Sequence, residues 1–257
     1  MRGSSSFNAL RARTAELAGF DHELLLDLDD TIITNMIMFM RSRDAIGPLL
    51  VALDRQGRSE ADLLDLHEQT SAVLYPEHGA TRRRWQLATT QTAAAAAGRP
   101  LTAAEETELL AAAKIAAGLG ELYPGVTETL TLLQDAGIKL GLVTKGESEL
   151  QEQKIAAHDL ARFFEGRIAI VSHKDGALLR ELAERFGFAN PLVIGDSAAS
   201  DVAPALAAGF PAVQIDHGAD ASIWKHESWQ GGEAPKVASF PDAILHLLDV
   251  RAAALAA

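Results

Sequence analysis

Hydrophobic and polar positions follow two alternating periods along the second half of the chain. Short apolar runs typical of buried strands lie at about 139–144, 167–171 and 192–195. Stretches with apolar residues at helical spacing follow them, at about 147–157, 175–186 and 199–208. A similar apolar run, Leu24 to Leu28, comes much earlier and leads directly into acidic residues. Because strands and helices alternate, we predict a parallel sheet with helices on both faces.

Between the first strand and the rest, residues from about 34 to 122 follow a different pattern. Ala, Leu, Glu and Arg recur there at helical spacing, and no segment has the pattern of a strand. Thr102 and Glu105 have the spacing of a capping box, which predicts a helix start. We therefore predict an α/β protein with a Rossmann-like core and an inserted helical domain.

Ligands of such sheets bind in the crevice at the carboxyl ends of the strands. Acids, hydroxyls, lysines and a histidine gather at these predicted ends, so four strands contribute polar side chains to one edge. The residues concerned are Asp27, Asp29, Asp30 and Thr31; Thr144 and Lys145; His173, Lys174 and Asp175; and Asp196, Ser197 and Asp201.

This order and spacing resemble the haloacid dehalogenase-like hydrolase superfamily. That superfamily carries DxDxT, a Ser or Thr, a Lys and GDxxxxD at successive strand ends, and each motif has a candidate here in the same order. The resemblance covers residues 20–45 and 123–216, and the helical block takes the place of a cap. It implies a hydrolase core of residues 1–34 and 123–257 and a helical cap of residues 35–122, which closes over the substrate and excludes water.

By this resemblance, the site would carry out phosphoryl transfer through a covalent intermediate. Asp27 would be the nucleophile and become an aspartyl phosphate, and Asp29 would be the general acid and then the general base. Thr144 and Lys174 would hold the transferring phosphoryl group. Lys145 is a second candidate for binding phosphate, because it also follows a strand.

The resemblance also implies a magnesium ion as cofactor. Its ligands would be the carboxylates of Asp27 and Asp196 and the backbone carbonyl of Asp29, an all-oxygen set that suits Mg²⁺. Asp201 would orient water or ligands from behind these groups. We interpret His173 as a surface residue.

Composition narrows the choice of chemistry and partners. The 257 residues contain no cysteine, which excludes disulfides, thiolate metal sites and a cysteine nucleophile. A net charge of -12 disfavours nucleic acid and anionic lipid as partners. No apolar run approaches the ~18 residues that cross a bilayer. We expect a cytoplasmic enzyme that acts on a small phosphorylated metabolite, with no membrane or nucleic-acid partner; no feature of the sequence specifies the oligomeric state.

Several alternatives remain open from the sequence. A haloacid dehalogenase needs neither the acid at Asp29 nor the metal, whereas a phosphomutase would share the whole core. A phospho-receiver module is also doubly wound, but the chain length and the acids on the first strand and after Gly195 disfavour it. A degenerate scaffold would require substituted motif positions, and none is substituted.

Three further segments have ordinary structural interpretations. We interpret Met36, Met38 and Met40 as packing between cap and core, with an apolar substrate pocket as the alternative. Arg82 to Trp85 suggests a solvated helix face. The segment 217–236, with Trp224 and Trp229, suggests a long loop held by its tryptophans.

Overall fold

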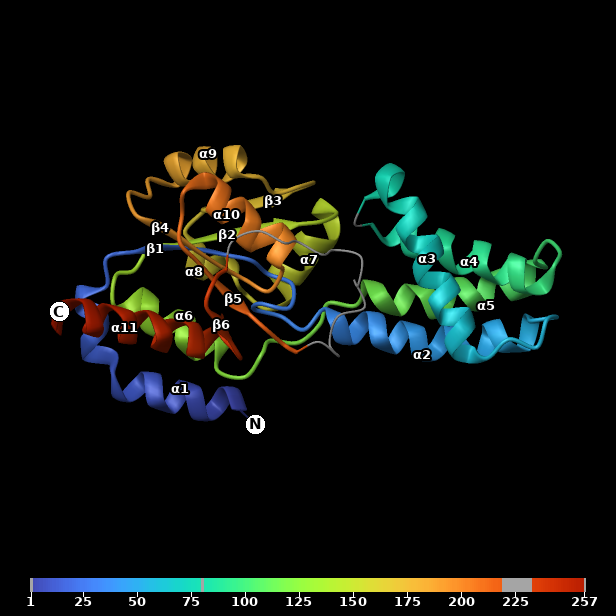
Figure 1. The fold of residues 1–257 in the computed structure, drawn as a ribbon, viewed down its shortest axis with the longest axis horizontal. Coiled ribbons are helices and arrows are strands. Elements are labelled where there is room, and N and C mark those ends of the chain that lie inside the picture. The colour runs from blue at the N-terminus through green and yellow to red at the C-terminus, as the bar shows by residue number, and fades with distance from the viewer. Residues whose placement is uncertain (1, 80, 219–232, 257) are drawn as a thin grey trace. The chain divides into compact units, whose positions relative to one another are not determined.

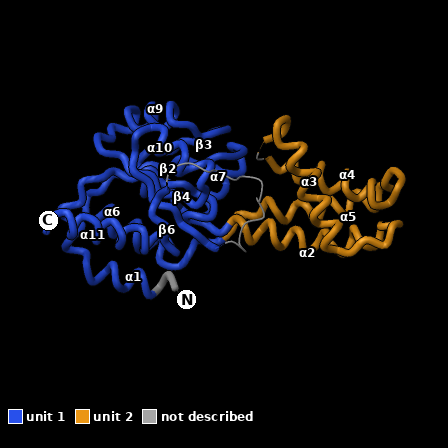
Figure 2. Tube along the Cα trace, viewed as in Figure 1, with its two compact units in different colours: residues 1–34, 121–257 blue, residues 35–120 orange. Residues whose placement is uncertain are grey.

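A computed structural model describes residues 2–79, 81–218 and 233–256 of the chain. Trp224 and Trp229 of the predicted loop lie outside the described residues. The chain divides into two compact units: unit 1 comprises Met1–Thr34 and Glu121–Ala257, and unit 2 comprises Asn35–Gly120 (Figure 2). The chain leaves unit 1 at Thr34 and returns to it at Glu121, and these two residues are hydrogen-bonded to each other. Thr34 N donates to Glu121 O at 2.7 Å, and Glu121 N donates to Thr34 Oγ1 at 2.9 Å.

Unit 1 is built on a six-stranded sheet in the order β3-β2-β1-β4-β5-β6, and every neighbouring pair is parallel. This confirms the predicted α/β class with a parallel sheet. The strands are β1 (Glu23–Leu26), β2 (Leu140–Lys145), β3 (Ile168–Val171), β4 (Pro191–Gly195), β5 (Ala212–Ile215) and β6 (Lys236–Val237).

Helices cover both faces of this sheet, as predicted. One face carries α1 (Arg2–Ala12), α6 (Val126–Asp135) and α11 (Phe240–Ala256), and the other carries α9 (Gly176–Phe186) and α10 (Ala203–Ala208) (Figure 1). Along β1, Leu24 and Leu26 pack into the core of the first face, whereas Leu25 packs into the core of the second. Alternate side chains of a strand point to opposite faces, so a strand covered on both faces is apolar throughout.

The remaining elements of unit 1 are short or connect strands. They are α7 (Ser148–Ala157), α8 (Ala161–Phe164), the 3₁₀ segment Thr14–Gly19 and the π-helical turn Ala198–Val202. The sequence predicted one helix over about 199–208, where the structure has this turn followed by α10. Strands β5 and β6 and helix α11 were not predicted.

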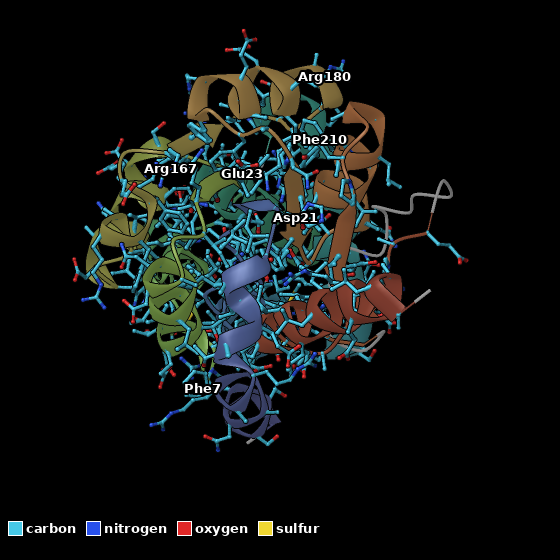
Figure 3. All side chains as sticks on the ribbon, turned by 90° about the vertical axis from the view of Figure 1, so that its left-hand side faces the viewer. Phe7, Asp21, Glu23, Arg167, Arg180 and Phe210 are labelled. Carbon is cyan, nitrogen blue, oxygen red and sulfur yellow. The ribbon has the colours of Figure 1, made fainter. Side chains whose placement is uncertain are left out.

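The amino end of β1 is held by hydrogen bonds of its own. Figure 3 shows Asp21 and Glu23 from the side on which β1 begins. The Glu23 carboxylate accepts hydrogen bonds from the backbone N–H groups of Ala189 (3.1 Å) and Asn190 (2.7 Å). The Glu23 carboxylate therefore serves the fold, at the edge opposite to the predicted site.

Unit 2 consists of α2 (Met36–Leu53), α3 (Glu60–His78), α4 (Arg82–Ala97), α5 (Ala103–Lys114) and the short 3₁₀ segment Ile115–Ala117. The capping box predicted at Thr102 and Glu105 is confirmed, because each side chain bonds to the other residue's backbone N–H. Among the described residues, no helix combines the length and the apolar character needed to cross a membrane.

The interior of unit 2 corrects the prediction of a solvated face at residues 82–85. Arg84 is only 4% exposed and Trp85 only 2%. The Arg84 guanidinium lies over the ring of Tyr75, 4.7 Å from its centroid, and the Trp85 indole N–H donates to Ser42 Oγ at 2.9 Å. Stacking on α3 and a hydrogen bond to α2 therefore hold in the interior two side chains that the local sequence assigns to water.

His67 is buried in the same unit with its charge suppressed. Its Nε2 lies 3.0 Å from Thr89 Oγ1, and the Thr89 hydroxyl itself donates to Trp85 O at 2.9 Å. The Thr89 oxygen must therefore accept, which assigns the imidazole proton to Nε2. Burial, together with the nearby Arg43 and Arg84, lowers the pKa of His67 to about 4.

We expect this histidine to destabilise the folded chain in mild acid. The unfolded chain binds the imidazole proton near pH 6.5 and the folded chain only near pH 4, so unfolding takes up a proton between these values. The free energy of unfolding should therefore fall by about 3 kcal/mol as the pH is lowered through that window. Urea unfolding at several pH values would measure it, with His67→Gln as the non-titrating control. An identical pH dependence in the two proteins would contradict the assignment.

Candidate active site

Four adjacent strands of the sheet bring the predicted site residues to one edge. The order β3-β2-β1-β4 places their carboxyl ends next to one another; β2 carries Thr144 as its penultimate residue, and the other three ends precede Lys174, Asp27 and Asp196. Asp27 continues the pairing beyond β1, because its N–H donates to Ile194 O of β4 at 3.0 Å. The nucleophile predicted from the sequence is thus fixed by backbone bonds between two central strands.

Asp27 and Lys174 form a buried ion pair. Lys174 Nζ lies 2.5 Å from Asp27 Oδ1 and 2.5 Å from Asp201 Oδ1, and its side chain is 4% exposed. Burial raises the pKa of Asp27 to about 7 against the opposing effect of Lys174, with Asp201 and Asp29 raising it further. Burial by itself lowers the pKa of Lys174, but the negative charges of Asp201 and Asp27 outweigh this effect and raise the pKa above its ordinary value. One ammonium group therefore serves two carboxylates.

Asp27, Asp196 and Asp201 could hold a metal ion together. One carboxylate oxygen of each lies within 4.8 Å of the other two. Desolvation and repulsion from Asp201 and Asp27 raise the pKa of Asp196 well above its ordinary value. A divalent cation would offset this concentrated negative charge, and an all-oxygen donor set suits Mg²⁺. The residues present therefore fit the metal that the sequence predicts.

Asp201 lies in this cluster because a glycine makes room for it. Its Oδ2 accepts from Ser197 N at 3.0 Å while Oδ1 accepts from Lys174. A Cβ atom on Gly195 would lie 2.3 Å from Asp201 Cγ, so a larger residue there would displace the carboxylate. Both Asp201 oxygens are engaged by protein donors, which suits the predicted orienting role.

The two candidate lysines have different neighbours. Lys174 reaches Asp27, whereas Lys145 Nζ donates to Ser200 Oγ at 2.8 Å on the π-helical turn after β4. His173, adjacent to Lys174, has a side chain that is 71% exposed. The geometry thus places Lys174 beside the candidate nucleophile and His173 at the surface.

The side chain of Asp29 does not belong to the three-acid cluster and contacts α7. Lys154 Nζ lies 2.7 Å from Asp29 Oδ1, and Gln151 Nε2 lies 3.1 Å from Asp29 Oδ2. Gln151 Nε2 also lies 2.5 Å from Thr144 Oγ1. A metal contact from Asp29 would therefore use its backbone carbonyl, as the resemblance implies.

Gln151 and Lys154 were not singled out from the sequence. They are three residues apart, which places them on one face of a helix that starts beside a strand end. That spacing is the signal that could have identified them.

Other residues missed by the sequence interpretation support the loop after β1. Asp30 has φ of 56°, and its backbone carbonyl accepts from His217 Nε2 at 2.5 Å. Tyr123 stacks on His217, with 5.1 Å between ring centroids, and its hydroxyl donates to Asp30 Oδ1 at 3.3 Å. Gln214 Nε2 donates to Asp196 O at 2.8 Å. The His217 and Tyr123 contacts hold Asp30 in a left-handed conformation that a non-glycine backbone disfavours, whereas the Gln214 contact holds the loop after β4.

Known proteins resemble this chain in sequence and in fold. The sequence model of the haloacid dehalogenase-like hydrolases matches residues 24–209. A stretch of 105 residues is 37% identical to the phosphoglycolate phosphatase of Escherichia coli K12. That alignment covers 38% of this chain and 40% of the enzyme, so it spans well under half of the relative's length.

Solved structures share the fold over most of the chain. A haloacid dehalogenase-like family hydrolase from Xanthomonas campestris superposes with a TM-score of 0.68 at 23% identity, covering 90% of this chain and 98% of that one. The HAD-hydrolase YfnB from Bacillus subtilis, solved with magnesium bound, gives a TM-score of 0.61 at 19% identity, covering 89% and 98%. At these identities the likeness is one of fold.

Proposed function

The chain belongs to the haloacid dehalogenase-like hydrolase family, and on that premise we propose that it is a magnesium-dependent phosphatase whose nucleophile is Asp27. The observation that carries the proposal is the cluster of Asp27, Asp196 and Asp201, in which the Lys174 ammonium pairs with Asp27 and Asp201. Halide displacement needs neither the metal nor an acid for the leaving group, so the cluster and Asp29 favour phosphate esters.

In the first step, an Asp27 carboxylate oxygen attacks phosphorus and the bond from phosphorus to the ester oxygen breaks. The leaving oxygen takes a proton from the Asp29 carboxyl group and departs as an alcohol. Thr144 and Lys174 bind the oxygens of the transferring group.

In the second step, Asp29 accepts a proton from water as the water oxygen attacks phosphorus. The bond to Asp27 breaks, which releases inorganic phosphate, restores the Asp27 carboxylate and leaves Asp29 protonated again for the next turnover. Asp27, Asp196 and the backbone carbonyl of Asp29 would hold magnesium, which supplies positive charge against the phosphoryl oxygens when bound. Asp201 keeps Lys174 in place through its ion pair.

We propose a small phosphorylated metabolite as the substrate and unit 2 as the cap that selects it. The partial identity to phosphoglycolate phosphatase makes 2-phosphoglycolate the first compound to test. A screen of phosphorylated metabolites that measures released phosphate would rank it against other esters.

Magnesium removal should stop the reaction. We expect the protein with MgCl₂ to hydrolyse p-nitrophenyl phosphate, and EDTA to lower the rate by at least about 10²-fold, because the site would lose several kcal/mol of charge stabilisation. Restoring free Mg²⁺ should restore the rate, and EDTA already saturated with Mg²⁺ is the matched control. Turnover that EDTA leaves unchanged would overturn the proposed metal dependence.

A further inference from the structure

Helix α7 presents two buried polar side chains toward the candidate site. Gln151 is 1% exposed and Lys154 is 2% exposed, although they lie on a helix between two strands of the sheet. Burying an ammonium group and an amide is unfavourable unless both find partners. The hydrogen-bond partners of Gln151 and Lys154 therefore indicate the role of these two side chains.

Together these two side chains hold both oxygens of Asp29. Lys154 Nζ lies 2.7 Å from Oδ1, and Gln151 Nε2 lies 3.1 Å from Oδ2. Since the carboxylate oxygens accept here, the amide must present its NH₂ group, which fixes the orientation of Gln151. The Asp29 side chain is 23% exposed, so it keeps access to a ligand while being held from behind.

Gln151 also links Asp29 to Thr144. Its Nε2 lies 2.5 Å from Thr144 Oγ1. When the threonine oxygen accepts this bond, the hydroxyl proton is directed elsewhere and can be donated to a phosphoryl oxygen. One helix thus orients the proposed acid–base group and the proposed phosphoryl-binding hydroxyl.

We propose that Lys154 and Gln151 are positioning residues for the proton transfers of Asp29. The proposal rests on the phosphatase function above and adds two residues to it. They hold the Asp29 carboxyl group where its proton passes to the leaving oxygen as the bond to phosphorus breaks and its electron pair stays on that oxygen. Neither side chain needs to touch the substrate.

A structural role for these residues predicts a different outcome. If Lys154 only filled the core, its loss would slow the hydrolysis of all esters by the same factor. If Lys154 positions Asp29, its loss should slow mainly the esters whose leaving group must be protonated. Nitrophenyl esters should be nearly unaffected, because a nitrophenolate departs without a proton. The leaving group therefore separates the two roles.

The test uses phenyl phosphates of similar size with graded leaving groups, from 4-nitrophenyl to 4-methoxyphenyl. For Lys154→Met and Gln151→Leu, we expect kcat/KM to fall by about 10²-fold on 4-methoxyphenyl phosphate and by less than about 3-fold on 4-nitrophenyl phosphate. Lys154→Arg retains the cation and should recover part of the loss. Gln153→Leu is the matched control, because Gln153 lies on the exposed side of α7 and bonds to Glu149.

A second readout is the Asp29→Asn background. In that background, Lys154→Met should not lower kcat/KM on 4-methoxyphenyl phosphate any further, since the side chain at position 29 no longer has an acidic proton to donate. Equal losses across the ester series, or full additivity with Asp29→Asn, would overturn the proposal. If Lys154→Met fails to fold, Gln151→Leu, which keeps the ion pair, decides the question by the same criteria. A wild-type protein that hydrolyses none of the esters would instead overturn the phosphatase function itself.

Discussion

Asp27→Asn is expected to lower phosphate-ester turnover by at least about 10⁴-fold, because an amide cannot attack phosphorus to form the acyl phosphate. The loss should be chemical, since Asn has nearly the same shape as Asp. Lys174 would still be paired with Asp201 at 2.5 Å. In the wild-type protein, burial raises the pKa of Asp27 to about 7, so keeping this carboxylate ionised at neutral pH destabilises the folded state. We therefore expect Asp27→Asn to melt at or above the wild-type temperature at neutral pH.

Phosphate release and thermal unfolding on the same preparations would check this result. Asp21→Asn is the matched control, since Asp21 is an exposed acid before the start of β1, at the far end of that strand from Asp27. Mass spectrometry of acid-quenched wild-type enzyme should find a phosphoryl group on the peptide that contains Asp27. Undiminished turnover in Asp27→Asn would exclude Asp27 as the nucleophile.

Lys174→Met is expected to damage both catalysis and folding. Its ammonium group lies 2.5 Å from both Asp27 and Asp201, and the side chain is buried. Removing one partner of a buried ion pair costs about 3 kcal/mol or more, because the remaining charges lose their compensation. Loss of a positive group from the phosphoryl site should lower kcat/KM by about 10²- to 10³-fold.

Lys145→Met provides the matched comparison. Lys145 stands at the neighbouring strand end but contacts Ser200, so we expect its loss to leave the free energy of unfolding within about 1 kcal/mol of wild type and to lower kcat/KM by about 10-fold. Urea unfolding and steady-state kinetics of the two variants would decide between them. A larger catalytic loss in Lys145→Met would assign the principal phosphoryl contact to Lys145.

Local chemistry explains the parts of the structure that were predictable. The apolar run that begins at Leu24 is a central strand because it is covered on both faces. The capping box of Thr102 and Glu105 involves residues three apart, so its hydrogen bonds depend on one helical turn alone. The positions of Asp27 and Asp196 at strand ends follow from the same short-range patterns.

Packing explains what the sequence interpretation missed. Arg84 and Trp85 were assigned to solvent, yet they are buried because Tyr75 and Ser42 from other helices meet them. Neither partner can be inferred from the local run of basic residues. The same holds for Tyr123 and His217, which stack on each other from distant parts of the chain and support Asp30.

The position of Asp27 at the end of a buried strand could be predicted from the sequence alone, because strand periodicity and the acid that ends it are properties of consecutive residues. The tertiary structure decided what surrounds it. Lys174 reaches Asp27 across 147 positions, and Lys154 reaches Asp29 across 125. Such contacts depend on which strands become neighbours, and that order is set by the packing of both sheet faces. Local periodicity therefore determined the elements and the acids at their ends, whereas strand order determined which charges meet.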